Sequence, residues 1–161
     1  MNVEVRMRKR CLSLVCVLAL LLSLSVENVR ASEGETMVDG SYLTHDDEST
    51  GEAVLIMRGE DLLSGTCKVS KGGTRIINAG GTTTAAHTVS KVGIAIVVER
   101  LKAGTSTWSY YRTWEVEKTN AISATTSKNL TVAGGYYYRV RATHWANSDV
   151  SSSFTNGVYI N

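Results

Sequence analysis

From residue 53 to its end, the chain alternates apolar and polar positions in short runs, which are separated by turns that contain glycine. The clearest runs are Val92–Leu101 and Tyr136–Trp145. A period of two residues is typical of strands, and no helical period persists over three turns in this part of the sequence. The chain also lacks proline and is rich in glycine, threonine and serine, a composition that favours strands joined by tight turns.

These runs predict an all-β fold: an antiparallel β-sandwich of about seven strands over residues 53–161. Gly104 lies in a predicted hairpin loop, and we expect Tyr136–Trp145 to be a central strand. Further turns are predicted at Gly72-Gly73, Gly80-Gly81 and Gly134-Gly135. The expected core comprises Val92, Ile94, Ile96, Val98, Trp108, Trp114, Leu130, Tyr136, Tyr138 and Val140.

Residues 1–31 have the three parts of a secretory signal peptide, which would form a helix during export. Arg6–Arg10 is basic, and Leu12–Val26 is an apolar run of about 15 residues, shorter than the roughly 20 that a spanning helix needs. Small residues then precede a predicted cleavage after Ala31. A lipoprotein signal is the alternative, but Cys11 and Cys16 lie at the start of the apolar run, whereas a lipidated cysteine follows it. We therefore predict a secreted, extracellular protein that meets the membrane only during export.

Charge and cysteine content narrow the function classes. Removal of residues 1–31 leaves 12 basic and 13 acidic residues, a net charge of −1, so no nucleic-acid partner is expected. Cys67 then remains alone and cannot form an intramolecular disulfide, which is typical of a Gram-positive exporter. A small buried hydrophobe is the favoured interpretation of Cys67, and a catalytic cysteine paired with His144 is the alternative.

Residues 32–52 are polar and acidic and predict a flexible leader before the folded domain. Within it, His45–Glu48 could bind a cation, but a solvated linker is the favoured interpretation because a metal site needs ligands fixed from several directions. The predicted organisation is a signal peptide over 1–31, a leader over 32–52 and a β-sandwich over 53–161.

No catalytic motif emerges from the sequence. The chain contains no Gly-x-Ser-x-Gly, and His87 and His144 are expected to be turn, surface or core-capping residues. Glu115 and Glu117 share one strand face, where a charged surface opposite arginines explains them as well as a pair of glycosidase carboxylates does. We therefore predict no catalytic, metal-binding or cofactor-binding residues and no cofactor.

One local pattern resembles the tyrosine corner of fibronectin type III and immunoglobulin-like sandwiches. Leu130 lies six residues before Tyr136, which opens the alternating strand. The resemblance implies that the Tyr136 hydroxyl bonds backbone a few residues upstream. It also implies that Tyr138 and Val140 point inward.

A second resemblance covers most of the chain after the signal. It is carried by the segments Leu62–Cys67, Ala85-Ala86, Glu99–Leu101, Thr107-Trp108, Gly135–His144 and Thr155–Ile160 in order. Together they are similar to a family of short secreted proteins of clostridia and related Gram-positive bacteria, catalogued as a domain of unknown function. The resemblance implies export and a single β domain, and it brings no activity and no site residues.

The face that carries aromatic and arginine residues is the candidate ligand-binding surface. Planar aromatic rings beside guanidinium donors suit sugar rings or a protein partner. The alternative is cross-strand pairing that only stabilises an exposed sheet. The predicted residues are Tyr111, Tyr137, Arg139, Arg141 and Trp145.

The sequence thus predicts a non-enzymatic binding or interaction module. Its expected ligand is a cell-wall or host glycan or a surface protein. A secreted enzyme, or an enzyme inhibitor, with an unrecognised site is the alternative.

Overall fold

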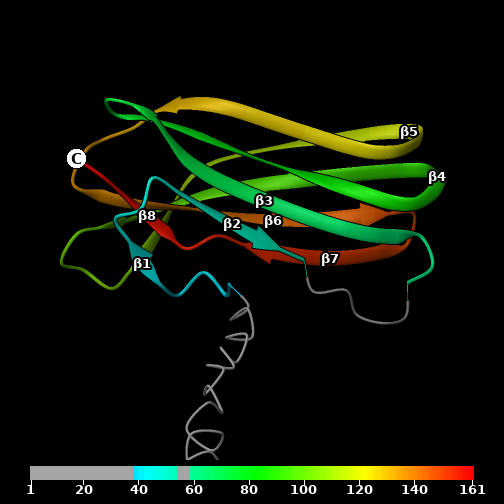
Figure 1. Ribbon diagram of the computed structural model, residues 1–161, viewed down its shortest axis with the longest axis horizontal. Helices are drawn as coiled ribbons and strands as arrows, with labels where there is room; N and C mark the ends of the chain where they lie inside the picture. The colour runs from blue at the N-terminus through cyan, green and yellow to red at the C-terminus, as the bar shows by residue number, and fades with distance from the viewer. Residues whose placement is uncertain (1–37, 54–58) are drawn as a thin grey trace, which may run out of the picture. The chain divides into compact units, whose positions relative to one another are not determined.

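The computed structural model describes residues 38–53 and 59–161. The predicted signal peptide, the cleavage site after Ala31, the start of the predicted leader and residues 54–58 of the predicted sandwich lie outside the described residues. The described residues contain eight strands and no helix. The strands are β1 (Leu43–Thr44), β2 (Glu48–Glu52), β3 (Leu62–Gly73), β4 (Ile76–Lys102), β5 (Trp108–Thr131), β6 (Tyr136–Ala146), β7 (Asp149–Phe154) and β8 (Gly157–Ile160) (Figure 1).

All eight strands belong to one sheet. Its main path runs β1-β8-β6-β4-β3-β2, with β5 paired to β4 and β7 paired to β6. Six of the seven strand pairings are antiparallel and the one between β1 and β8 is parallel, so the sheet is mixed. The prediction of an all-β fold is confirmed for the described residues, and β6 is central because it pairs with β4, β7 and β8.

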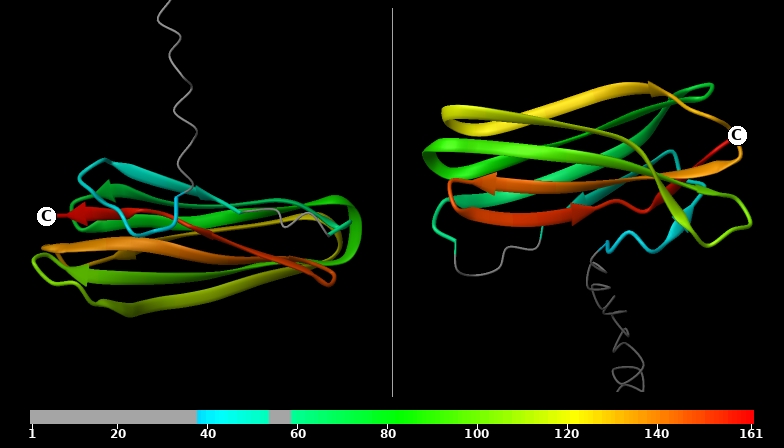
Figure 2. Two further views of the ribbon diagram at one scale, coloured as in Figure 1. Left: turned by 90° about the horizontal axis from the view of Figure 1, so that it is seen from below. Right: turned by 180° about the vertical axis from the view of Figure 1, so that it is seen from behind.

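A bend in the two longest strands folds this sheet back on itself. β4 and β5 pair along most of their length, with a register shift between Thr84 and Val89. Beside this shift, Asn120 of β5 has a φ of +50°, a left-handed conformation that asparagine tolerates better than most residues. Before the bend β4 also pairs with β3, and after it β4 pairs with β6 (Figure 2).

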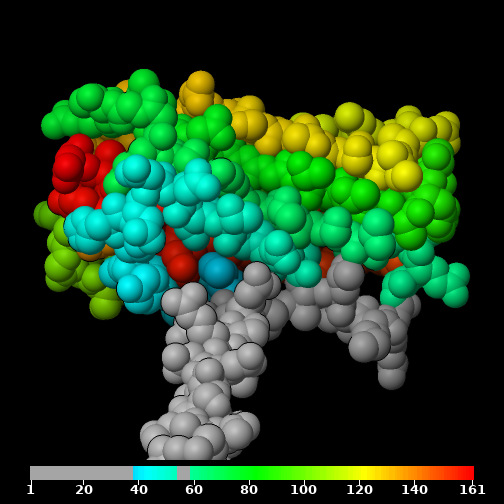
Figure 3. All heavy atoms as spheres, viewed as in Figure 1, coloured from blue at the N-terminus to red at the C-terminus, as the bar shows by residue number. Residues whose placement is uncertain are grey.

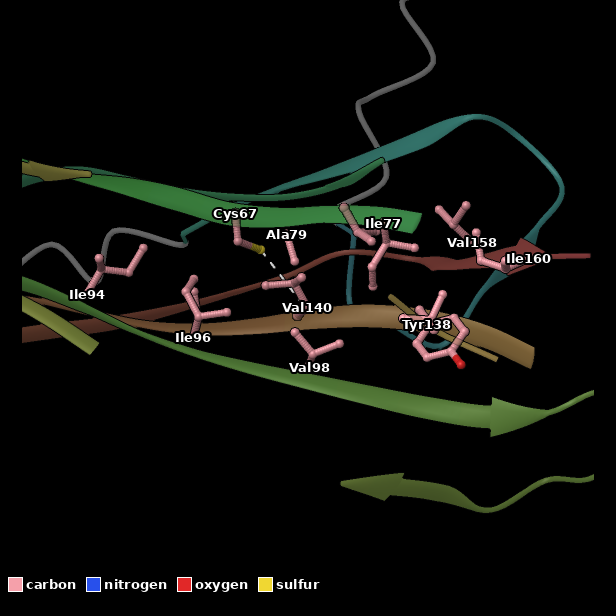
Figure 4. Close-up of a cluster of buried hydrophobic side chains, with 13 residues drawn as sticks. Cys67, Ile77, Ala79, Ile94, Ile96, Val98, Tyr138, Val140, Val158 and Ile160 are labelled. Atoms are coloured by element: carbon pink, nitrogen blue, oxygen red, sulfur yellow. Dashed lines mark hydrogen bonds between the residues drawn. The ribbon is translucent and has the colours of Figure 1, made fainter. Parts of the chain in front are cut away.

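The hydrophobic core lies between the two parts of the curled sheet. In Figure 4, Cys67, Ile77 and Ala79 project from one part toward Ile96 and Val140 on the other. Fully burying a large apolar side chain stabilises a fold by roughly 1.5–3 kcal/mol. The cluster comprises Cys67, Val69, Ile77, Ala79, Ile94, Ile96, Val98, Val132, Tyr138, Val140, Ala142, Val158 and Ile160.

Six members of the predicted core are buried, and four are only half-buried. The buried ones are Val92, Ile94, Ile96, Val98, Tyr138 and Val140. The half-buried ones are Trp108, Trp114, Leu130 and Tyr136. Trp114, Leu130 and Tyr136 pack against the margin of the core, whereas Trp108 lies close to Gly157 and stacks against Arg139.

The tyrosine that bonds the upstream backbone is Tyr138, and not Tyr136 as the resemblance implied. The Tyr138 hydroxyl donates to the Ala133 carbonyl at 3.0 Å and accepts from the Ala133 N–H at 3.1 Å. Tyr138 is fully buried, and Tyr136 lies beside it with ring centroids 6.3 Å apart. Strand alternation puts both tyrosines on the face of Val140 and Ala142, so the difference comes from their position along β6. Tyr136 is half-buried at the first residue of the strand, whereas Tyr138 is fully buried in the core.

Strands begin earlier in the chain than the predicted boundary at residue 53. Within the predicted leader, β1 pairs with β8 and β2 pairs with β3 over five residue pairs. Neither strand shows apolar alternation, and the buried position of β2 is a glycine. A side chain at Gly51 would collide with the backbone of Phe154, so the small residue lets β2 approach the end of β7.

Gly80-Gly81 is not a turn, because β4 runs straight through it. A Cβ atom at Gly80 would lie 2.2 Å from the Thr126 carbonyl oxygen, and one at Gly81 would lie 2.3 Å from that of Thr66. The two glycines therefore permit close approach of both neighbouring strands. The turns predicted at Gly73, Gly104 and Gly135 are present, and all three have positive φ.

Candidate ligand-binding face

The candidate site lies on the outer face, which is defined here as the side of β5, β4 and β6 that points away from the core. Odd-numbered residues of β4 from Gly93 onward share this face, because the even-numbered Ile94, Ile96 and Val98 point into the core. Glu99 is paired with Tyr110 of β5 on one side and with Arg139 of β6 on the other. Three strands thus bring an acid, a base and an aromatic ring into one row.

A single carboxylate holds both predicted arginines. Glu99 Oε2 accepts from Arg139 Nε at 2.8 Å, and Glu99 Oε1 accepts from Arg141 Nη1 at 3.0 Å. The side chains of Glu99 and Arg139 are 14% and 16% exposed, whereas that of Arg141 is 49% exposed. The network carries one net positive charge, and Arg141 is its accessible part.

Arg139 is committed to contacts within the fold. Its guanidinium carbon lies 4.1 Å from the centre of the Trp108 ring, within the range of a cation–π contact. Its Nη1 donates to the Gly40 carbonyl at 2.6 Å. Arg139 therefore fastens the segment before β1 to the outer face, which leaves little of it for a ligand.

Arg141 and Trp145 remain on the outer face, and each is held in place. The Arg141 guanidinium lies 5.6 Å from the centre of the Phe154 ring on β7. The Trp145 indole donates to Glu117 Oε2 at 3.0 Å and occupies the space that a side chain at Gly93 would fill. Glycine inside a strand signals such a close approach, so Gly93 was the available clue to a fixed indole.

Tyr137 turns toward the β1–β2 loop and joins a cluster of three rings. Its ring centroid lies 5.0 Å from that of Tyr159 and 5.9 Å from that of His45. The Tyr137 hydroxyl lies 3.3 Å from His45 Nε2. We name Tyr137, Tyr159 and His45 the ring cluster. It adjoins the outer face, but Tyr137 is half-buried within it.

Tyr111 does not join the other predicted residues. Its ring makes a T-shaped contact with buried Tyr138 at 5.6 Å, and its hydroxyl donates to the Thr131 carbonyl at 2.6 Å. The cause is a bulge, because Val98 pairs with Arg112 while Glu99 pairs with Tyr110. The extra residue is Tyr111. Tyr110, which the sequence pattern did not single out, takes the outward position at 62% exposure.

The histidine and cysteine considered for catalysis are buried. His144 Nδ1 lies 2.8 Å from the Thr83 hydroxyl, and its Nε2 lies 2.8 Å from the Ser153 hydroxyl. Because Thr83 donates to the Gly93 carbonyl, it accepts from His144 Nδ1–H, which leaves Nε2 to accept from Ser153. Burial lowers the pKa of His144 to about 4.

The Cys67 thiol is also poorly suited to nucleophilic chemistry. Burial raises its pKa to about 11, so the reactive thiolate is scarce at neutral pH. Cys67, His144, Ser153 and Thr83 are all fully buried, so no substrate can reach them without local opening. The arrangement fits a satisfied polar chain within the core.

The remaining polar candidates are paired on the surface. His87 Nε2 lies 3.0 Å from Asp61, and Lys91 lies 3.8 Å from Glu117. In the predicted cation-binding run, Asp47 pairs with Lys71 and Glu48 pairs with Lys68. Within residues 38–53 and 59–161, no three histidine, cysteine or acidic side chains gather as a metal site would require.

Comparison of the chain with protein-family models, curated proteins and solved structures found no match. Over the described ranges, no helix has the length and apolar character needed to cross a membrane.

Proposed function

We propose that this chain is a secreted, non-enzymatic binding module whose outer face binds a carbohydrate or a protein ligand at the bacterial surface or in its surroundings. One observation carries the proposal. The half-exposed Arg141 guanidinium is fixed by Glu99 of β4, and the exposed Tyr110 is the register partner of Glu99 on the neighbouring strand β5. A fixed donor beside accessible aromatic surface can recognise a ligand at low cost in side-chain entropy.

The geometry revises which residues we expect to touch the ligand. Tyr110, Arg141 and Trp145 present accessible or half-accessible groups on the outer face. Arg139 is expected to hold the fold in place without touching the ligand, because it already contacts Trp108 and Gly40. Tyr137 is expected to do the same, because it packs against Tyr159 in the ring cluster. Tyr111 is expected to support the core.

A glycan and surface-protein array tests the proposal. The probe is the protein recovered from cells that express the full chain, either unchanged or carrying Tyr110→Ala with Arg141→Ala. We expect specific binding by the unchanged protein and a loss of about tenfold or more in the double variant, because a charged hydrogen bond and an aromatic contact are removed. Ile122→Ala, which removes an exposed apolar side chain from the second half of β5, is the matched control.

Two results would reject the outer face as the binding surface. The first is an unchanged binding profile in the double variant. The second is an equal loss in the Ile122→Ala control, which would point to general stickiness of exposed apolar groups.

We also propose that the curled sheet is a variant of the fibronectin type III and immunoglobulin-like sandwich. The backbone bonds of Tyr138 support this proposal, because they act as the hydroxyl of a tyrosine corner does. The proposal extends to the family of secreted clostridial proteins, on the residues quoted above. An experimental structure in which the connections between strands follow another order would overturn the fold assignment.

Export with cleavage after Ala31 belongs to the same proposal. The three-part pattern of residues 1–31 supports it. Intact mass and N-terminal sequence of the protein in culture medium are the test. A first residue of Ser32 is the expected result, and retention of the apolar run would contradict cleavage.

A further inference from the structure

A pocket lies beside the ring cluster. The β1–β2 loop, the turn between β3 and β4, and β8 surround a pocket of about 570 Å³. Its walls include His45, Lys71, Arg75 and Tyr159. In Figure 3 the C-terminal residues, in red, meet the cyan β1–β2 segment and the green end of the β3–β4 hairpin on one side of the molecule.

The pocket carries two cationic side chains from neighbouring elements. Lys71 Nζ donates to the His45 carbonyl at 2.8 Å and pairs with Asp47 at 3.1 Å, although that carboxylate is 91% exposed to water. Arg75 has no acidic partner among the described residues. The guanidinium of Arg75 therefore offers five donors that this part of the fold does not use.

The backbone fixes the position of Arg75. Its φ is +56°, which is uncommon for a residue other than glycine, asparagine or aspartate. Its carbonyl accepts from the Val132 N–H at 2.9 Å. A positive φ and a hydrogen bond to backbone next to β5 thus fix the main chain of a residue that lines the pocket, and residues in such conformations are often found at ligand sites.

Aromatic rings also line the pocket. The ring centroids of His45 and Tyr159 lie 4.7 Å apart, and Tyr137 supports both from the outer face. Each ring of the cluster contacts the other two. The two rings are tilted by 48° to each other, so each offers its own aromatic surface to a sugar ring.

We propose that this pocket binds an acidic sugar, with its carboxylate or sulfate held by Arg75 and Lys71 and its ring packed on Tyr159 and His45. The planar guanidinium matches the geometry of both oxyanions. The inference does not rest on the proposed function, because Tyr110, Arg141 and Trp145 do not line this pocket. Failure at one surface is therefore distinguishable from failure at the other.

Amide shifts in nuclear magnetic resonance spectra provide the test, using isotope-labelled protein recovered from cells that express the full chain. Glucuronate and glucose 6-sulfate are the two acidic probes, glucose is the neutral match, and inorganic sulfate tests the anion without a ring. We expect saturable shifts at the amides of Gly73, Thr74 and Arg75 with both acidic sugars, and the two dissociation constants show whether the pocket prefers a carboxylate or a sulfate. Glucose and inorganic sulfate should bind at least about tenfold more weakly, since each lacks one half of the recognition.

Variants separate the charge from the fold. Arg75→Asn removes the guanidinium while keeping a residue that accepts positive φ, and Lys71→Gln keeps a donor without the charge. Each should weaken the acidic sugars about tenfold, while Lys118→Gln, an exposed lysine on β5, should leave them unchanged.

Three outcomes would overturn the proposal: equal binding of glucose and glucuronate, no saturable shift at these amides with either acidic sugar, or unchanged affinity in both pocket variants. Sulfate that binds as tightly as the acidic sugars would reject the role of the aromatic wall.

Discussion

Tyr138 illustrates how one hydroxyl group can anchor a strand. It bonds both the N–H and the carbonyl of Ala133, the residue that leads from β5 into the turn before β6. Burial raises the pKa of Tyr138, so the phenol stays neutral and keeps its donor at ordinary pH. The turn at Gly135 and the entry of β6 into the core are therefore tied to the same side chain.

Tyr138→Phe should lower the free energy of unfolding by about 1–2 kcal/mol, because two backbone groups lose their partner. Tyr136→Phe is the matched control, since no hydrogen bond of its hydroxyl is found among the described residues. It should change stability by less than about 0.5 kcal/mol. Urea denaturation of both variants measures the difference, and a larger effect at Tyr136 would restore it as the corner residue.

His144 makes the stability of the folded state depend on pH, and the direction of that dependence follows from its lowered pKa. Its pKa is lowered from 6.5 to about 4, so the folded state disfavours the charged ring while the unfolded state accepts a proton below pH 6.5. Stability from this residue is therefore fully present above pH 6.5 and is lost as the pH falls toward 4. The total loss should be up to about 3 kcal/mol.

Chemical denaturation of the parent and of His144→Gln across that range isolates this contribution. The glutamine does not titrate, so the free energy of unfolding should fall less steeply with acid in the variant than in the parent. Carboxylates affect both proteins alike and cancel in the comparison. Parallel pH curves would show that His144 does not carry this linkage.

At the scale of elements, glycines decide how closely strands and side chains approach. Gly93 lies inside β4 between β5 and β6, and a Cβ atom there would be 2.1 Å from the Trp145 ring. Gly65 of β3 leaves similar room for the imidazole of His144. These positions explain why glycine occurs inside long strands, where it is otherwise unfavourable.

Gly93→Ala should destabilise the protein by about 1–3 kcal/mol through overpacking against the indole. The same substitution in a Trp145→Ala background should cost much less, because the space has been vacated. Thermal unfolding of the two single variants and the double variant forms a cycle that measures the coupling. Additive effects would mean that the indole does not occupy the space over Gly93 in solution.

The sequence predicted the strand-rich fold, the hairpin at Gly104 and the inward face of Tyr138 and Val140, because alternation reports directly on burial. It could not reveal the strands within 43–52, since Gly51 serves close packing without an apolar pattern. It also could not place Tyr111, because a single bulged residue reverses the face of everything before it. The exposure of Tyr110 and the pocket around Arg75 could not be predicted either, because both result from contacts between segments that are far apart in the sequence.

The whole molecule is held by pairings between distant parts of the chain. β1 lies against β8, and the second half of β4 lies between β5 and β6. Residues from β3, β4, β6 and β8 meet in one cluster, so the described residues should lose their structure together. Such topologies fold slowly, in milliseconds to seconds, because the entropy cost of closing long loops comes before the stabilising contacts between distant residues can form.

The absence of proline makes a sharper kinetic prediction about the same molecule. The sequence contains no proline, so the unfolded chain cannot accumulate the slow isomers that delay many proteins by roughly 10–100 s. Refolding should therefore show no phase in that range. Its amplitudes should not depend on how long the protein has been unfolded, and a prolyl isomerase should not accelerate it. Double-jump stopped-flow fluorescence of the three tryptophans measures this directly. A slow phase that grows over minutes in denaturant would contradict the prediction and would point to another slow step, such as mispairing in the register of the long β4–β5 ribbon.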